Sequence, residues 1–356
     1  MNGNSIIVDS TTAAVSGSKV TITFAGNYDI RGSLTDGQII VNTKNDGIVR
    51  LILNGINVTC SNSAPIYIAK AEKTLIVLAD NTESFLVDGT SYILDADNEP
   101  NATIYSKSYL SFFGKGSLTV NANYNDGITS KDGLVIKSGS FNISSADDGI
   151  RGKDYLLLRS GNIIINSKGD GMKSDNDEDT SLGFITIDSA VVNITTTSGD
   201  GINARTNLKI NDGSYTITTG GGAGTTASRA GTPNVGGDTG SSGGYSGTTS
   251  EKALKAKTSL IIEKGTFIIN AADDALHSNG TVAINGGTIS IAAGDDAIHA
   301  ESSIIINDGT LNILKCYEGI ESAAITVNSG NIDLVLTDDG FNATKGLTAG
   351  GGEANV

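Results

Sequence analysis

The six-residue stretch DDGIRG at 147–152 belongs to a series of related stretches, and this series decides the fold. In each copy an acidic residue precedes Gly or Ala, a large apolar residue, a variable residue and a small residue. Such regular recurrence indicates a repeat architecture. The further copies are NDGITS, GDGMKS, GDGINA, DDALHS, DDAIHA, YEGIES and DDGFNA, with EKALKA as a degenerate copy.

The large apolar residue of each copy recurs at a step of 22 residues, or 21 at the last interval. Two intervals are longer, by 8 and by 30 residues, and each contains an insertion: DNDED at 175–179 and a Gly-, Ser- and Thr-rich tract at 220–250. A second, Gly-containing signal runs in phase, so each unit holds two or three short strands. The apolar residues are Ile128, Ile150, Met172, Ile202, Leu254, Leu276, Ile298, Ile320 and Phe341.

This period predicts an all-β fold, a single-stranded parallel β-helix with coils of about 22 residues that stack about 4.8 Å apart. The leucine-rich-repeat pattern and a nine-residue period are both absent. We expect one domain over 1–356, with irregular N-terminal coils at 1–120, regular coils at 121–345 and a loop insertion at 220–250. Cys60 and Cys316 fall too many coils apart for a disulfide, which predicts two core thiols.

The charge balance excludes several classes of partner. The chain has 24 basic and 39 acidic residues, a net charge of −15, and no basic block. Nucleic acid is therefore not expected as a partner, because phosphate binding needs clustered Lys and Arg. No apolar run of about 18 residues appears, so we expect no membrane span in this chain.

Acidic residues in the same phase are expected to form one column along the coils. Carboxylates one coil apart repel by roughly 3.5 kcal/mol at an effective dielectric constant near 20. Ca²⁺ relieves this repulsion because it takes six to eight oxygen ligands. The alternative is that Asp simply suits turns, although turn chemistry does not explain the doubled Asp. The predicted ligands of several Ca²⁺ ions are Asp126, Asp147, Asp148, Asp170, Asp175, Asp200, Asp273, Asp274, Asp295, Asp296, Asp338 and Asp339.

A second column is formed by the variable residue after each apolar residue, which strand alternation turns outward. Five of its members are basic or histidine: Arg151, Lys173, Lys255, His277 and His299. We expect them to bind a ligand that carries carboxylates and hydroxyls, such as a polyuronate. Two alternatives stay open: these side chains neutralise the acidic column, or the two histidines hold a transition metal.

With these strings laid out, the chain resembles the bacterial carbohydrate-binding β-helix proteins, which include clostridial surface proteins that bind cellulose and polygalacturonate. GDGMKSDNDED is the most specific shared string, and the Gly-rich insertion after ITTGGG is also typical. The resemblance implies a right-handed β-helix of pectate-lyase-like shape that holds several Ca²⁺ ions. It also implies an extracellular or cell-surface protein whose leader is absent here. The calcium ligands it implies are Asp147, Asp148, Asp170, Asp175 and Asp200.

Three functions are weighed. The first is non-catalytic, calcium-dependent binding of polysaccharide, acidic rather than neutral because the chain lacks Trp for a flat cellulose platform. The second is a calcium-dependent pectate-type lyase, with Lys173 or Arg151 as the base. Neighbouring carboxylates raise the pKa of such a base, which counts against it. The third is an adhesin or structural module. We favour the first and assign no catalytic residue.

Overall fold

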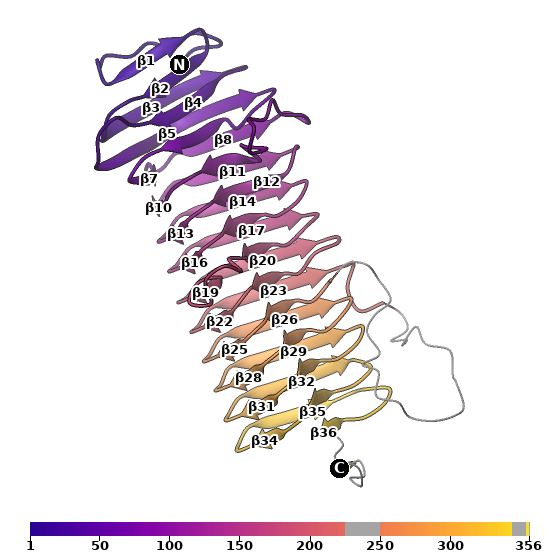
Figure 1. Cartoon of the computed structure of the whole chain (residues 1–356). Helices are drawn as coiled ribbons and strands as arrows, with labels where there is room; N and C mark the ends of the chain where they lie inside the picture. Colours follow the sequence, from indigo (N-terminus) through magenta and orange to yellow (C-terminus); the bar gives the residue numbers. More distant parts are fainter. Residues whose placement is uncertain (225–249, 344–353, 356) are drawn as a thin grey trace.

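The computed structural model describes residues 1–224, 250–343 and 354–355, in which all helical or extended regular structure is β-strand. Figure 1 shows an elongated stack of coils with the two termini at opposite ends. The all-β prediction is confirmed, as are the parallel sheets. Residues 225–249 of the expected loop insertion lie outside the described part. No described segment forms a helix of the length and hydropathy needed to cross a membrane.

One face of the stack is a 15-stranded sheet to which each coil contributes one short strand. Its strands run parallel except at the two ends, where β1 and β2 pair antiparallel, as do β36 and β37. The strands are β1 (Ala13–Ser16), β2 (Lys19–Ile22), β4 (Gln38–Asn42), β6 (Ile66–Lys70), β9 (Ala102–Ser106), β12 (Asp126–Ser130), β15 (Ile150–Gly152), β18 (Met172–Ser174), β21 (Ile202–Ala204), β24 (Leu254–Ala256), β27 (Leu276–Ser278), β30 (Ile298–Ala300), β33 (Ile320–Ser322), β36 (Phe341–Ala343) and β37 (Ala354–Asn355).

The second sheet has 22 strands and consists of two parallel ladders joined at its N-terminal end. The long strands β3 (Gly26–Leu34) and β5 (Ile48–Cys60) pair with each other, and β5 also pairs with the first strand of each ladder. One ladder contains β7 (Lys73–Leu78), β10 (Leu110–Gly114), β13 (Gly133–Ile136), β16 (Tyr155–Leu158), β19 (Phe184–Ile187), β22 (Asn207–Ile210), β25 (Ser259–Ile262), β28 (Thr281–Ile284), β31 (Ser303–Ile306) and β34 (Ile325–Val327). The other contains β8 (Glu83–Asp88), β11 (Ser117–Ala122), β14 (Ser140–Ser145), β17 (Asn162–Ser167), β20 (Val191–Thr196), β23 (Ser214–Thr219), β26 (Thr266–Ala271), β29 (Thr288–Ala293), β32 (Thr310–Lys315) and β35 (Asn331–Leu334).

Apolar residues of equal phase stack inside the coils. Ile128 pairs with Ile150, which pairs with Met172, which pairs with Ile202. None of these four side chains is more than 1 % exposed. Burying a large apolar side chain stabilises the fold by about 1.5 to 3 kcal/mol, so this stack holds adjacent coils in one register. The pairing passes unbroken across the 30-residue interval, and the segment 175–179 therefore leaves the coil as a loop.

Both cysteines are free and buried, which confirms the prediction of two core thiols. The division into irregular coils at 1–120 and regular coils at 121–345 stays a prediction.

Candidate functional site

A buried ladder of aspartates runs along one edge of the short-stranded sheet. The backbone N–H of Asp148 donates to Asp126 Oδ1 at 3.3 Å, that of Asp170 to Asp148 Oδ1 at 2.8 Å, and that of Asp200 to Asp170 Oδ1 at 2.8 Å. Each of these side chains is at most 7 % exposed. Every coil therefore offers an N–H group to the carboxylate of the coil before it.

Burial makes ionisation of this ladder unfavourable. It raises the pKa of Asp126 to about 7 and that of Asp148 to about 6, and the next carboxylate in the ladder adds to each shift. Burial also raises the pKa of Asp200, where Lys255 opposes the shift. The ladder needs compensating cations, which are the opposite charges that favour ionisation.

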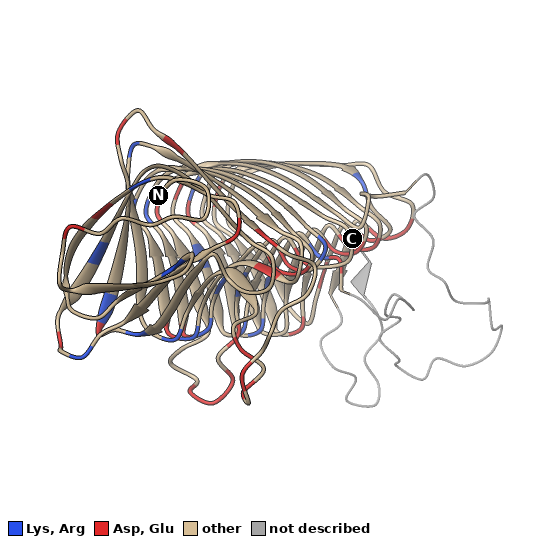
Figure 2. Cartoon of the chain, turned by 90° about the horizontal axis from the view of Figure 1, so that it is seen from above, with Lys and Arg blue, Asp and Glu red and all other residues tan. Residues whose placement is uncertain are grey.

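The second predicted column supplies several of these cations. Lys173 Nζ lies 3.1 Å from Asp148 Oδ2 and 3.0 Å from Asp170 Oδ2. Lys255 Nζ lies 3.0 Å from Asp200 Oδ2. These contacts agree with the neutralising role that the sequence left open. Figure 2 shows acidic and basic residues close together on the same part of the coils.

The degenerate copy EKALKA contributes a cation where other copies have the second Asp. The backbone N–H of Lys252 continues the ladder by donating to Asp200 Oδ1 at 2.9 Å. Its Nζ reaches forward to Asp273 Oδ2 at 2.6 Å and to Asp274 Oδ2 at 2.9 Å. The substitution thus places a lysine between two acidic parts of the column.

The two histidines bind the C-terminal part of the ladder. His277 Nδ1 lies 2.8 Å from Asp274 Oδ2, and His299 Nδ1 lies 2.9 Å from Asp296 Oδ2. Their rings are stacked, with centroids 5.1 Å apart. Burial opposes protonation of His299, but hydrogen bonds to Asp296 and Glu321 raise its pKa to about 10. His299 is therefore a cation at neutral pH, in the same role as the lysines.

Arg151 does not join the ladder as Lys173 does. Its Nε lies 3.1 Å from both carboxylate oxygens of Asp175, and its second guanidinium nitrogen lies 2.8 Å from Asp175 Oδ2. Asp175 is thus placed on the outer face of the sheet. The structure does not bring it together with Asp147, Asp148 and Asp170 as one ligand set.

The first aspartates of the doubled pairs form a more accessible row beside the ladder. Asp147 is exposed, and a Cβ added at Gly169 would lie 2.3 Å from Asp147 Oδ1 and 2.7 Å from Asp148 Oδ1. Asp273, Asp274 and Asp295 each place an oxygen within 4.8 Å of the other two. Converging carboxylate oxygens suit a hard cation such as Ca²⁺. Asp338 and Asp339 lie in the last described coil, exposed and half-buried.

A further column of basic residues is absent from the sequence prediction. It stands two residues after the second column, and backbone hydrogen bonds join its coils, as from Lys131 N–H to Ser106 O and from Lys153 N–H to Ser130 O. The signal was present in ITSK, IRGK, INAR and LKAK, where Lys or Arg closes each short strand. We call it the basic column: Lys107, Lys131, Lys153, Arg205 and Lys257.

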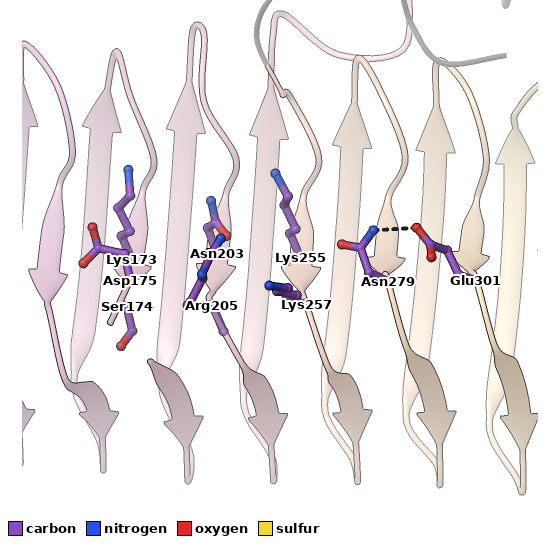
Figure 3. A pocket seen from close by; sticks show the side chains of 10 residues that line it. Lys173, Ser174, Asp175, Asn203, Arg205, Lys255, Lys257, Asn279 and Glu301 are labelled. Atoms are coloured by element: carbon purple, nitrogen blue, oxygen red, sulfur yellow. Dashed lines mark hydrogen bonds between the residues drawn. The ribbon is translucent and has the colours of Figure 1, made fainter. Parts of the chain in front are cut away.

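The second column and the basic column together line a pocket of about 550 Å³ on the outer face of β18, β21, β24, β27 and β30. Figure 3 shows Asp175 near one end and Glu301 at the other, where Glu301 accepts a hydrogen bond from Asn279 at 2.6 Å. Basic and amide side chains occupy the middle. The lining residues are Lys173, Ser174, Asp175, Asn203, Ala204, Arg205, Lys255, Lys257, Asn279 and Glu301.

Comparison with known proteins agrees with this picture. A family model described as "Carbohydrate-binding domain-containing protein" matches residues 16–297 and 279–356. A protein of that description from Acetivibrio thermocellus is 42 % identical over 134 residues, which are 37 % of this chain and 47 % of that protein. The match thus spans about half the length of this relative.

A solved structure is also similar to the chain. It is described as the polysaccharide lyase-like protein from C. thermocellum, gadolinium derivative, and it aligns with a TM-score of 0.60 and 34 % sequence identity. The alignment covers 62 % of this chain and 90 % of that one.

Proposed function

The chain belongs to the family of carbohydrate-binding domain-containing proteins, and on this premise we propose that it binds an acidic polysaccharide without cleaving it. The polymer is of the polygalacturonate or pectin type, with cellulose as a weaker candidate. Binding depends on calcium and takes place outside the bacterial cell. The scaffold is a right-handed, single-stranded parallel β-helix with coils of about 22 residues.

The composition of the pocket supports this proposal most directly. Lys173, Arg205, Lys255 and Lys257 line one depression in a chain whose net charge is −15. Lys257 forms no ion pair with any other residue of the described ranges, so its ammonium group is available to a ligand. Arg and Lys recognise carboxylates by charge-assisted hydrogen bonds. Asn203 and Asn279 add amide groups that suit sugar hydroxyls.

An acidic ligand fits this pocket better than a neutral one. Binding sites for neutral sugars commonly use an aromatic ring that stacks on the sugar face. The ten lining residues include no aromatic residue. Four cationic side chains instead match a polymer that carries one carboxylate on each sugar.

Calcium is assigned to the accessible row of aspartates. Asp147 and Asp148 converge at Gly169, and Asp273, Asp274 and Asp295 form a second oxygen cluster. Bound Ca²⁺ supplies positive charge that reduces repulsion within the acidic edge and between that edge and a polyanion. The solved relative is described as a gadolinium derivative, and gadolinium, like calcium, is a hard cation that prefers oxygen ligands.

The alternative of a lyase is weaker because its base must be unprotonated at working pH. Burial lowers the pKa of Lys173, but Asp170 and Asp148 outweigh burial and hold it above its ordinary value. Asp175 has the same effect on Arg151. Both groups therefore stay protonated and serve as carboxylate binders.

Affinity electrophoresis tests the proposal. We expect polygalacturonate in the gel to retard the protein, and a chelator to restore its mobility. Lys257→Gln should reduce the retardation, whereas Lys264→Gln, which removes the same charge from an exposed turn outside the pocket, should not. Unchanged mobility in acidic and neutral polysaccharide gels would support the structural module instead. Growth of the ultraviolet absorbance of unsaturated uronide would show a lyase.

A further inference from the structure

We infer that the carboxylate-binding site extends beyond the open pocket and beneath the acidic segment 175–179, which occupies it as an internal competitor. Taking the proposed function as premise, we assign Arg151, Lys153 and Arg205 as further ligand-binding residues. In the free protein the segment's own carboxylates hold them. The ligand that displaces the segment is a polymer with closely spaced carboxylates.

The acidic segment faces three cations in the manner of a bound polyanion. Asp175 makes the two-pronged contact with Arg151, the geometry with which a guanidinium takes any free carboxylate. Glu178 Oε1 lies 3.2 Å from Lys153 Nζ. Asp177 Oδ2 lies 3.9 Å from the guanidinium of Arg205. One short segment thus places carboxylates at cations on β15, on the turn after it and on the turn after β21.

Other groups than these carboxylates shape the segment. Asn176 is 6 % exposed, and its side-chain N–H donates to Asp154 Oδ1 at 2.6 Å. Its Oδ1 accepts the backbone N–H groups of Glu178 and Asp179, each at 3.0 Å. Asp179 in turn accepts the backbone N–H of Ser181 at 2.8 Å. Charge can therefore be removed from Asp177 and Glu178 while the loop keeps its internal hydrogen bonds.

A second acidic segment repeats this arrangement independently at the N-terminal end of the basic column. Between β8 and β9, Glu99 places one carboxylate oxygen 2.8 Å from Lys107 Nζ and the other 2.9 Å from Lys131 Nζ. Asp95 adds a contact of 3.3 Å to Lys107. Four of the five members of the basic column are thus paired with acidic loops. Within the described ranges, Lys257 alone of this column makes no ion pair.

The contacts around residues 177 and 178 are weak enough for a ligand to displace. The side chains of Asp177 and Glu178 are 60 % and 78 % exposed, and exposed ion pairs contribute about 0 to 1 kcal/mol each. A tethered carboxylate nevertheless acts at an effective concentration of roughly millimolar. Removing both charges should therefore tighten the binding of polygalacturonate by about threefold to tenfold, the factor that corresponds to about 0.6 to 1.4 kcal/mol.

The test uses the full chain carrying Asp177→Asn and Glu178→Gln together. Its dissociation constant for polygalacturonate is measured by calorimetry at fixed calcium and salt, beside the wild type. The matched control is Asp188→Asn with Asp308→Asn, which removes the same charge from corners between the two ladders of the second sheet. We expect tighter binding in the segment variant alone. Circular dichroism and thermal unfolding verify that both variants are folded.

The outcomes separate this inference from the proposed function. If the wild type binds and the segment variant binds equally or more weakly, the segment is no competitor, and weaker binding would assign it to the binding surface itself. If the control variant tightens binding as much, only overall charge matters and the inference fails. If the wild type and the variants all fail to bind polygalacturonate, the proposed function fails and the inference falls with it.

Discussion

The backbone N–H of Asp170 donates to the carboxylate of Asp148 at 2.8 Å, although the two residues are 22 positions apart. The 22-residue period creates this contact because it sets equivalent corners of adjacent coils on top of each other. The same relation joins Asp148 to Asp126 and Asp200 to Asp170. A turn residue in one coil is thereby a hydrogen-bond acceptor for the next.

Replacing the cation between two ladder carboxylates should destabilise the fold. Lys173→Met keeps the apolar stem but leaves Asp148 and Asp170 without the ammonium group that contacts both. We expect the free energy of unfolding to fall by about 2 to 4 kcal/mol, because buried carboxylates lose their counter-charge. Urea unfolding measures the change, with Lys264→Met as control. A loss below about 0.5 kcal/mol would show that water screens the ladder.

The stability of the N-terminal coils should depend on acid pH through Glu99. Burial opposes its ionisation, but hydrogen bonds from Lys107 and Lys131 outweigh burial and lower its pKa from 4.5 to about 2. Because the folded state holds the lower pKa, the stabilisation is complete above about pH 4.5 and lost as the pH falls towards 2. It amounts to at most about 3 kcal/mol. Glu99→Gln should flatten this part of the stability profile, and an unchanged slope would contradict the assignment.

Crowding the space beside Asp147 should weaken the calcium response. In Gly169→Ala the new Cβ would meet carboxylate oxygens of Asp147 and Asp148, so they must move apart. We expect calcium to raise the unfolding temperature of this variant less than that of the wild type. Gly224→Ala is the control, since nothing lies within 4 Å of its Cβ position. A full calcium response in Gly169→Ala would place the ion elsewhere.

Binding of polygalacturonate should weaken as salt is added. Between about 0.01 M and about 0.1 M salt the Debye length falls from about 30 Å to about 10 Å, which screens attraction between exposed charges. Lys257→Gln should show a shallower salt dependence because it lacks one exposed cation of the pocket. Titrations at several salt concentrations, each with fixed calcium, measure both slopes. Equal slopes for the two proteins would remove Lys257 from the contact.

Much of the site could be anticipated because phase translates directly into position. The letters around Ile150 and Met172 predicted that their acidic neighbours stack, and the register places them so. The role of Lys173 as a counter-charge was also foreseen as an alternative. The basic column was overlooked because attention stopped at the first outward position, although Lys153 and Lys257 stand only two residues further along the sequence.

The partner of Arg151 could not be read from the sequence. Its phase equals that of Lys173, yet it turns to Asp175 in a loop that departs from the repeat. A period fixes the position of residues inside the coils, but it says nothing about where an inserted segment folds back. That choice depends on non-local contacts such as the one between Asn176 and Asp154.

The sequence by itself determined the parallel stacking, the apolar interior and the columns of charge, because a constant step in a β chain leaves equivalent residues one strand spacing apart. Only the tertiary structure decided how those charges are shared. It directs lysines and histidines onto the buried aspartates and folds acidic loops over the basic column. The reason is physical: stacking is set by local repetition, whereas each ion pair is a competition among all the charges that the fold brings within reach.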